Sequence, residues 1–409
     1  MARFYEVLSS YRSVFIVWLF LMILLVGFII FFDRYGEVLV MRAWEEYPPN
    51  AYEVGMKYLD EGRPEKAARK LETALEFAAR PGGREAAWKV RNAKLNLGKI
   101  YYELGQYDRA LPFLKEIAEN APGLELGTPV FYLGEVYRKK GEKEEAANAF
   151  KLTTEWNFGP VSAVAFFRMS ELDAEAGRYE SAVGNLETAI TLDAGEALTD
   201  EMWQRAATIA REAAGRAGGA AAALAHELLG ISLYRLKGLD ASVEELEAAL
   251  KRGRNTQRVD YFLAKIYQAQ GMHEKAQQHF AQLPRGKVVI EGKDMIHTFG
   301  YHTGDAWAVV RNGKLRHELF LADRIEKIEV VAKGTVANFV SARMVALLAG
   351  ERVGGVETTD KGCERYVFGT SVSKEHALLE IEFANDYRDP ETGEDRNLYV
   401  QEIAIYYSS

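Results

Sequence analysis

The chain has little of what stabilises disulfide-rich or metal-clustered proteins. Its 409 residues include one cysteine, Cys363, so neither an intramolecular disulfide nor a cysteine-based zinc site can form. The seven histidines show no metal-ligand spacing such as H-E-x-x-H. We interpret the histidines as ordinary residues and Cys363 as a small residue of the core.

Motifs of common catalytic sites are also missing. The sequence contains no phosphate-binding glycine loop, no G-x-S-x-G elbow and no set of kinase motifs. Its formal charge of −8 is spread over segments of mixed sign, which is not the basic surface that nucleic acid requires. The chain is therefore predicted not to be an enzyme and not to bind nucleic acid.

One long apolar run is present near the start. Residues 14–32 read VFIVWLFLMILLVGFIIFF without a charge, which is enough helix to cross a hydrocarbon core roughly 30 Å thick. No small-residue cleavage site follows, as a removable signal peptide would have. We expect a single membrane-spanning helix at residues 14–32, preceded by a tail at 1–13 and followed by a linker at 33–49.

Helical periodicity punctuated by glycine extends from residue 50 to 285. The clearest unit has Leu97, Gly98 and Tyr101 on a first helix, Gly105 at the turn and Ala110 on a second helix. This pattern resembles the tetratricopeptide repeat, whose period is 34 residues. About six units agree in register, and their first-helix small residues are Gly55, Gly98, Gly134, Ser170, Gly230 and Ala264.

The repeats predict an all-α solenoid. Small residues let the two helices of a unit approach closely, and stacked units form an elongated surface that typically binds peptides or partner proteins. An alanine-rich stretch near 195–223 keeps helical spacing, so we expect an extra or degenerate helical pair there. In the weaker unit that follows, Gly238 stands one residue late.

The pattern changes to a two-residue period after residue 285. Alternating segments at 306–310, 325–332, 378–383 and 397–407 indicate strands, and Gly354-Gly355 indicates a turn. About eight short strands in this length favour an all-β sandwich of jelly-roll type over residues 286–409.

An acidic loop precedes the last of these strands. Carboxylates at this density suit a hard cation such as calcium, although the spacing is not that of a helix-loop-helix calcium site. On this chemistry alone, a solvated acidic turn remains an alternative. The acidic residues of the loop are Asp386, Asp389, Glu391, Glu394 and Asp395.

Three parts of this loop resemble the calcium-dependent xylan-binding carbohydrate-binding modules: Asn-Asp-Tyr at 385–387, Asp-Pro-Glu-Thr-Gly at 389–393 and Glu-Asp-Arg-Asn-Leu-Tyr-Val at 394–400. In that family, calcium is held by aspartate side chains and a carbonyl, and sugar hydroxyls complete its coordination. The resemblance implies metal ligation by the side chains of Asp386 and Asp395 and by the carbonyl of Glu394. Asp389 is a further metal candidate, and Tyr387 and Asn397, together with Asp386 and Asp395, are candidates for carbohydrate binding.

Together these features predict a membrane-anchored scaffold outside the cytoplasm, in the periplasm or at the cell surface. Its repeats would bind a protein partner, and its terminal module would bind a polysaccharide through calcium, as exopolysaccharide assembly, export or retention requires. The alternative is a purely protein-interacting scaffold whose β-sandwich is structural and binds no sugar.

Overall fold

The structure is a computed structural model. It describes residues 22, 47–81, 85–120, 127–156, 160–193, 197–297, 300–303, 306–309, 313–320, 324–370, 376–388 and 394–407. The chain divides into two compact units, residues 1–117 and 118–409, and each is described by itself.

The expectation of a membrane-spanning helix is wrong for the part of the chain that the structure describes. In that part, no helix is both long enough and apolar enough to cross a bilayer. Residues 14–32 lie outside the described residues except for Met22. Helix α3 (Pro64–Ala79), for example, has one apolar face: it buries Ala67 and Leu71 and exposes Glu65. The fold class is therefore corrected to a helical solenoid followed by a β-sandwich.

The first unit consists of helix pairs. A short 3₁₀ helix, η1 (Pro48–Asn50), precedes α2 (Ala51–Asp60), which packs with α3, and α4 (Ala87–Glu103) precedes α5 (Tyr107–Asn120). Each pair meets at a small residue. A Cβ atom added at Gly98 of α4 would lie 2.5 Å from Cδ2 of Leu114 on α5, so only glycine allows the two helices their present separation.

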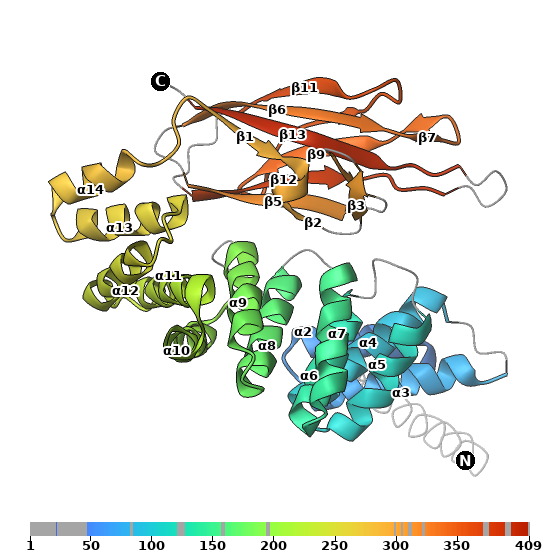
Figure 1. The fold of residues 1–409 in the computed structure, drawn as a ribbon. Helices are drawn as coiled ribbons and strands as arrows, with labels where there is room; N and C mark the ends of the chain where they lie inside the picture. The colour runs from blue at the N-terminus through green and yellow to red at the C-terminus, as the bar shows by residue number, and fades with distance from the viewer. Residues whose placement is uncertain are drawn as a thin grey trace, which may run out of the picture. The chain divides into compact units, whose positions relative to one another are not determined.

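The second unit continues the same arrangement and then changes to strands (Figure 1). Gly230 of α11 packs against Leu246 of α12 as Gly98 packs against Leu114. The stretch near 195–223, where an extra or degenerate helical pair was expected, holds α10 and the start of α11. The helices of this unit are α6 (Gly127–Lys140), α7 (Lys143–Trp156), α8 (Pro160–Glu175), α9 (Tyr179–Asp193), α10 (Asp200–Arg216), α11 (Gly219–Arg235), α12 (Leu239–Lys251), α13 (Gln257–Ala269) and α14 (His273–Phe280).

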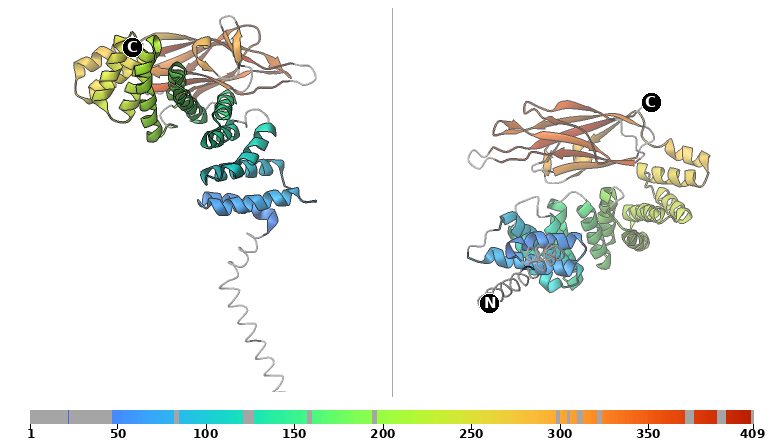
Figure 2. Two further views of the ribbon diagram at one scale, coloured as in Figure 1. Left: turned by 60° about the horizontal axis from the view of Figure 1, so that its bottom comes forward. Right: turned by 180° about the vertical axis from the view of Figure 1, so that it is seen from behind.

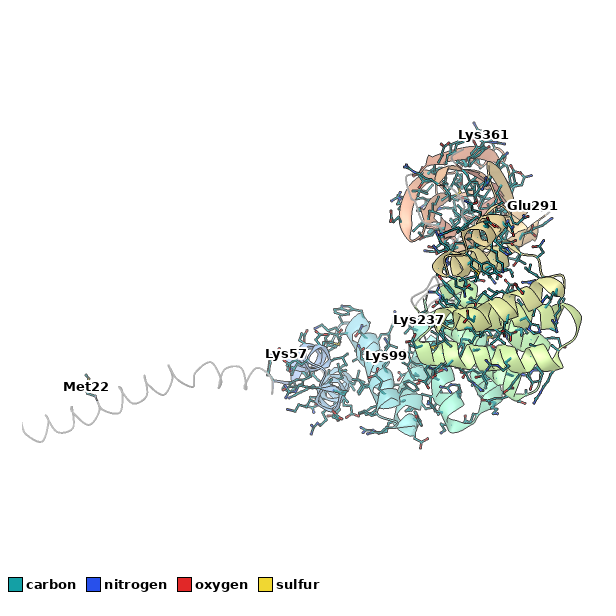
Figure 3. The ribbon with its side chains drawn as sticks, turned by 90° about the vertical axis from the view of Figure 1, so that its left-hand side faces the viewer. Met22, Lys57, Lys99, Lys237, Glu291 and Lys361 are labelled. Carbon is teal, nitrogen blue, oxygen red and sulfur yellow. The ribbon has the colours of Figure 1, made fainter. Side chains whose placement is uncertain are left out.

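The turn inside each repeat requires a positive φ angle. Gly105 has φ 70° and Gly271 has φ 73° at this position. In the α11–α12 unit, the late Gly238 leaves Lys237, labelled in Figure 3, at the turn. Lys237 adopts φ 62°. A lysine is therefore forced into a backbone conformation that disfavours a Cβ atom.

The sandwich contains two antiparallel sheets, seen from behind in Figure 2. One has the order β11-β6-β13-β4-β3 with β1 also paired to β13, the other has the order β10-β9-β12-β5-β2, and β7 and β8 form a separate hairpin. The described residues contain thirteen strands, more than the roughly eight expected, and three of them have only two residues, too few for alternation to be detected. Their bounds are β1 (Lys287–Glu291), β2 (Ile296–His297), β3 (Gly300–Thr303), β4 (Ala306–Val309), β5 (Gly313–Phe320), β6 (Ile325–Gly334), β7 (Val336–Ala337), β8 (Val340–Ser341), β9 (Arg343–Leu348), β10 (Glu351–Glu357), β11 (Glu364–Gly369), β12 (His376–Phe383) and β13 (Leu398–Tyr407).

Two smaller expectations are also corrected. Gly354 and Gly355 do not form a turn but lie within β10, where an added Cβ at Gly354 would come 2.1 Å from Phe368. Cys363 is exposed rather than part of the core. Both errors arise because small residues such as glycine and cysteine occur in turns, in close packing contacts and at the surface, so the residue type alone does not distinguish these positions.

The outer face of the β5 sheet packs against the last repeat. Phe320 is 5% exposed and belongs to the same buried cluster as Tyr261 and Phe262 of α13. Its ring stacks on that of His376, with centroids 4.9 Å apart and planes 4° apart. The sandwich therefore completes the apolar core at the end of the repeats.

Candidate functional site

The described ends of the acidic loop are held as a narrow antiparallel pair. The loop follows β12 and precedes β13, and Arg388 and Asp395 form an isolated β-bridge across it. The amide of Arg396 donates to the carbonyl of Tyr387 at 2.9 Å. The structure thus brings Tyr387 and Asp395 to facing stretches of one loop. The predicted ligand Asp389 lies outside the described residues.

The side chain of Thr335, just before β7, fixes the second half of the loop. Its hydroxyl donates to the carbonyl of Asp395 at 2.6 Å and accepts from the amide of Asn397 at 2.7 Å. Its own amide donates to the carbonyl of Asn397 at 2.9 Å. These bonds fix the backbone of Asp395 and Asn397, and therefore the points from which their side chains extend.

Asn397 has an oxygen without a partner. Its amide nitrogen donates to Oδ2 of Asp395 at 3.3 Å, but Oδ1 is buried and accepts no hydrogen bond. Leaving a buried acceptor unpaired costs about 1–3 kcal/mol. Calcium takes six to eight oxygen ligands, and amide oxygens are among those it accepts. The orphaned oxygen beside a carboxylate therefore fits a hard cation better than it fits a closed protein network.

The other predicted ligands have different surroundings. Asp386 is half-buried near the start of the loop, and Glu394 is exposed. The carboxylate of Glu394 accepts from the amide of Asn338, at the tip of the β7–β8 hairpin, at 3.2 Å. Within the described residues, no group of three or more His, Cys, Asp or Glu side chains is placed to hold a metal ion. A cation here would need amide, carbonyl or ligand oxygens in addition to carboxylates.

Tyr387 is half-buried, and one face of its ring lies near a cation. Cζ of Arg396 is 4.9 Å from the ring centroid. Arg396 is only 8% exposed and donates to the carbonyls of Asn385 at 2.7 Å and Ala337 at 3.3 Å. The sequence offered no sign that Arg396 connects the loop to β7, because Ala337, whose backbone carbonyl it binds there, is 59 positions away in the chain.

An exposed aromatic residue was also missed. Phe339 lies between the two strands of the β7–β8 hairpin and is 99% exposed. A single phenylalanine between Asn338 and Val340 resembles any strand residue in sequence, so only the structure places it beside the acidic loop.

A second polar cleft, of about 580 Å³, lies between the repeats and the β5 sheet. Its central charges form ion pairs: Arg254 bridges Glu187 and Glu227, and Arg258 binds Glu318. Burial by itself raises the pKa of Glu318, but the charge of Arg258 and the hydrogen bond from His376 outweigh it and lower that pKa. The cleft has the character of a structural ion-pair network rather than of a charged binding site.

Comparisons with known proteins give a family match for part of the sandwich and another for part of the repeats. Residues 327–407 match the family model of the xylan-binding Ca-dependent carbohydrate-binding module. Residues 52–125 match a tetratricopeptide repeat model. The two resemblances expected from the sequence are thereby confirmed, and both kinds of domain are non-catalytic. No curated protein matches the chain.

The solved structures similar to this chain include two carbohydrate-binding modules and a tetratricopeptide repeat protein. A carbohydrate-binding module in complex with calcium and xylotriose is 18% identical, covering 29% of this chain and 98% of its own, with a TM-score of 0.22. A module of a multidomain xylanase from the hindgut metagenome of Trinervitermes trinervoides is 12% identical, covering 30% and 98%, with a TM-score of 0.26. A tetratricopeptide repeat protein from Parabacteroides merdae is 16% identical, covering 57% and 91%, with a TM-score of 0.30.

Proposed function

We propose that the chain is a non-catalytic scaffold whose C-terminal module binds a polysaccharide through calcium at the acidic loop. The observation that supports this most directly is the buried, unpaired Oδ1 of Asn397 next to the carboxylate of Asp395. Both residues lie within the stretch that matches the calcium-dependent family model.

The residues that would hold calcium are Asp386, Asp395 and Asn397, with the carbonyl of Glu394. When bound, calcium supplies coordination positions that neutral sugar hydroxyls can fill in place of water. The chain's own residues set the geometry: Thr335 fixes the backbone of residues 395–397, and Arg396 joins the loop to β7. The described ends of the loop, held in this way, lose little further freedom on binding, which favours affinity.

The repeats would position this module by binding a protein partner. Tetratricopeptide solenoids present extended surfaces formed by successive helices, and such surfaces bind peptides and proteins. The proposed ligand is a polysaccharide outside the cytoplasm, which the scaffold would bind during the assembly, export or retention of that polysaccharide. The competing account is a purely protein-interacting scaffold, in which the sandwich only completes the core of the last repeat.

Calorimetry separates these two accounts. The full-length chain is titrated with neutral and acidic polysaccharides in calcium and then in excess chelator, beside Asp395→Ala. The matched control is Asp360→Ala, an exposed carboxylate in the β10–β11 turn. Binding that needs calcium, survives Asp360→Ala and is lost in Asp395→Ala supports the proposal. A folded wild-type chain that binds no polysaccharide in calcium leaves the protein-interacting account.

A further inference from the structure

The tip of the β7–β8 hairpin exposes an aromatic ring that the fold does not use. Phe339 is 99% exposed and Val340 is 40% exposed. Phenylalanine is among the residues whose burial contributes most to a core or an interface, so a ring left almost wholly in water contributes almost none of this stabilisation to the folded chain.

The backbone at this tip adds a second cost. The two residues of the turn both have positive φ, 49° at Asn338 and 59° at Phe339. A two-residue hairpin of this kind prefers Asn-Gly, because glycine has no Cβ to collide with the backbone. Phe339 occupies the glycine position. Both its side chain and its backbone are thus unfavourable for stability.

The hairpin is joined to the acidic loop. The amide of Asn338 donates to the carboxylate of Glu394 at 3.2 Å, and Nε of Arg396 donates to the carbonyl of Ala337 at 3.3 Å. Thr335, two residues before Ala337, hydrogen-bonds the backbone of Asp395 and Asn397. The hairpin that carries Phe339 is therefore held by residues of the acidic loop, and Phe339 lies at the side of the candidate calcium site.

We propose that Phe339 is a sugar-binding residue whose ring packs against the sugar next to the one held at the acidic loop. This inference rests on the proposed function and adds a second contact to the same site. A pyranose ring has an apolar C–H face and polar edges, which matches an isolated aromatic ring among polar groups such as Asn338 and Glu394. Because the calcium-bound sugar lies at the loop and Phe339 lies beside it, only a ligand of two or more sugars reaches both.

The site would then select an oligosaccharide chain over a single sugar. A monosaccharide would bind at the loop alone and would not depend on the hairpin. A longer ligand would gain the aromatic contact, so the side chain of Phe339 would decide the dependence of affinity on chain length.

The test compares chain lengths in the full-length protein. Wild type, Phe339→Gly and Phe339→Tyr are titrated in calcium with xylotriose, cellotriose and mannotriose, and with xylose, glucose and mannose. Val367→Ala is the matched control, because Val367 is 57% exposed on β11 of the same sandwich. Binding of calcium alone and the thermal midpoint are measured for every variant.

We expect Phe339→Gly to weaken trisaccharide binding about tenfold, as loss of a well-placed aromatic contact does, without changing binding of calcium or of the monosaccharide. Its thermal midpoint should rise, since the turn becomes Asn-Gly. Phe339→Tyr and Val367→Ala should bind as wild type does. Unchanged trisaccharide affinity in Phe339→Gly, with calcium binding intact, overturns this inference and leaves the proposed function standing. A wild-type chain that binds neither calcium nor any of these sugars overturns both.

Discussion

Arg258 of α13 and Glu318 of β5 form a buried ion pair between the last repeat and the sandwich, with side chains 11% and 7% exposed. Arg258 also donates to Thr191 of α9 at 2.6 Å, and Glu318 accepts from His376 at 2.7 Å. The pKa of Glu318 is lowered, so both groups are charged at neutral pH. One arginine thus connects two helices of the solenoid to a strand of the sandwich.

Glu318→Ala should destabilise the chain strongly, because it leaves Arg258 buried without its main partner. The expected loss is about 3 kcal/mol of unfolding free energy, the usual result of breaking a buried pair from one side. Lys143→Ala is the control, since Lys143 pairs with Glu175 at the surface, where side chains are 61% and 42% exposed, and should change stability by about 0.5 kcal/mol or less. Urea unfolding of both variants checks this. Similar, small losses in both would show that the junction pair contributes little.

Acid should lower the unfolding free energy of the chain through Glu329, on the outer face of the sheet that contains β6. The hydrogen bond from Tyr406, with those from Lys327 and Arg365, lowers the pKa of Glu329 to about 2. An unfolded glutamate has a pKa of about 4.3, so this stabilisation is complete above that pH and is lost as pH falls towards 2.

Unfolding free energies of wild type and Glu329→Gln, measured between about pH 6 and pH 3, should therefore converge as the solution becomes more acidic. A difference that stays constant across this range would mean that the carboxylate has an ordinary pKa in the folded chain.

The glycines of the helices should respond in opposite directions to the same substitution. Gly98→Ala places a Cβ 2.5 Å from Leu114 and should cost about 1–3 kcal/mol through overpacking. Gly215→Ala on α10 meets no atom within 4 Å and should stabilise the chain by about 0.5–1 kcal/mol, because alanine is the better helix former. Thermal unfolding of the two variants measures both signs. Equal effects would contradict the packing described for the repeats.

The displaced glycine of the α11–α12 unit should be correctable. Lys237 has φ 62° where the other repeats described above have glycine, so Lys237→Gly should raise stability by up to about 1 kcal/mol, the strain of a left-handed lysine less the entropy of an added glycine. Gly105→Ala, the reverse change at an equivalent turn, should lower stability. A loss of stability in Lys237→Gly would show that the lysine side chain stabilises the turn.

Much of the repeat region could be predicted from the sequence, because each repeat depends on local spacing. Leu97, Gly98 and Tyr101 stand at fixed intervals on one helix, and the turn follows at Gly105. The same reasoning noticed that Gly238 is late but could not tell that Lys237 would adopt the left-handed turn in its place.

The apolar run at 14–32 lies outside the described residues except for Met22. Its length and hydropathy favoured a membrane-spanning helix, whereas no helix among the described residues could span a bilayer.

The candidate site was only partly accessible to sequence reasoning. Acidic density indicated the loop, and the resemblance to carbohydrate-binding modules singled out Asp386 and Asp395 as candidates. The structure adds what depends on distant contacts: the hydroxyl of Thr335, the guanidinium of Arg396 and the exposed ring of Phe339. Thr335 and Asp395 are 60 positions apart in the chain, so no local pattern connects them.

The most direct test of the account is mobility of the full-length chain in native gels that contain a polysaccharide, run in calcium, in chelator and after calcium is restored. Calcium-dependent binding at the acidic loop predicts retardation in calcium, loss of retardation in chelator and its return with calcium, for at least one polysaccharide, and no retardation of Asp395→Ala under any condition. Equal mobility of wild type with and without calcium in every polysaccharide would contradict the account.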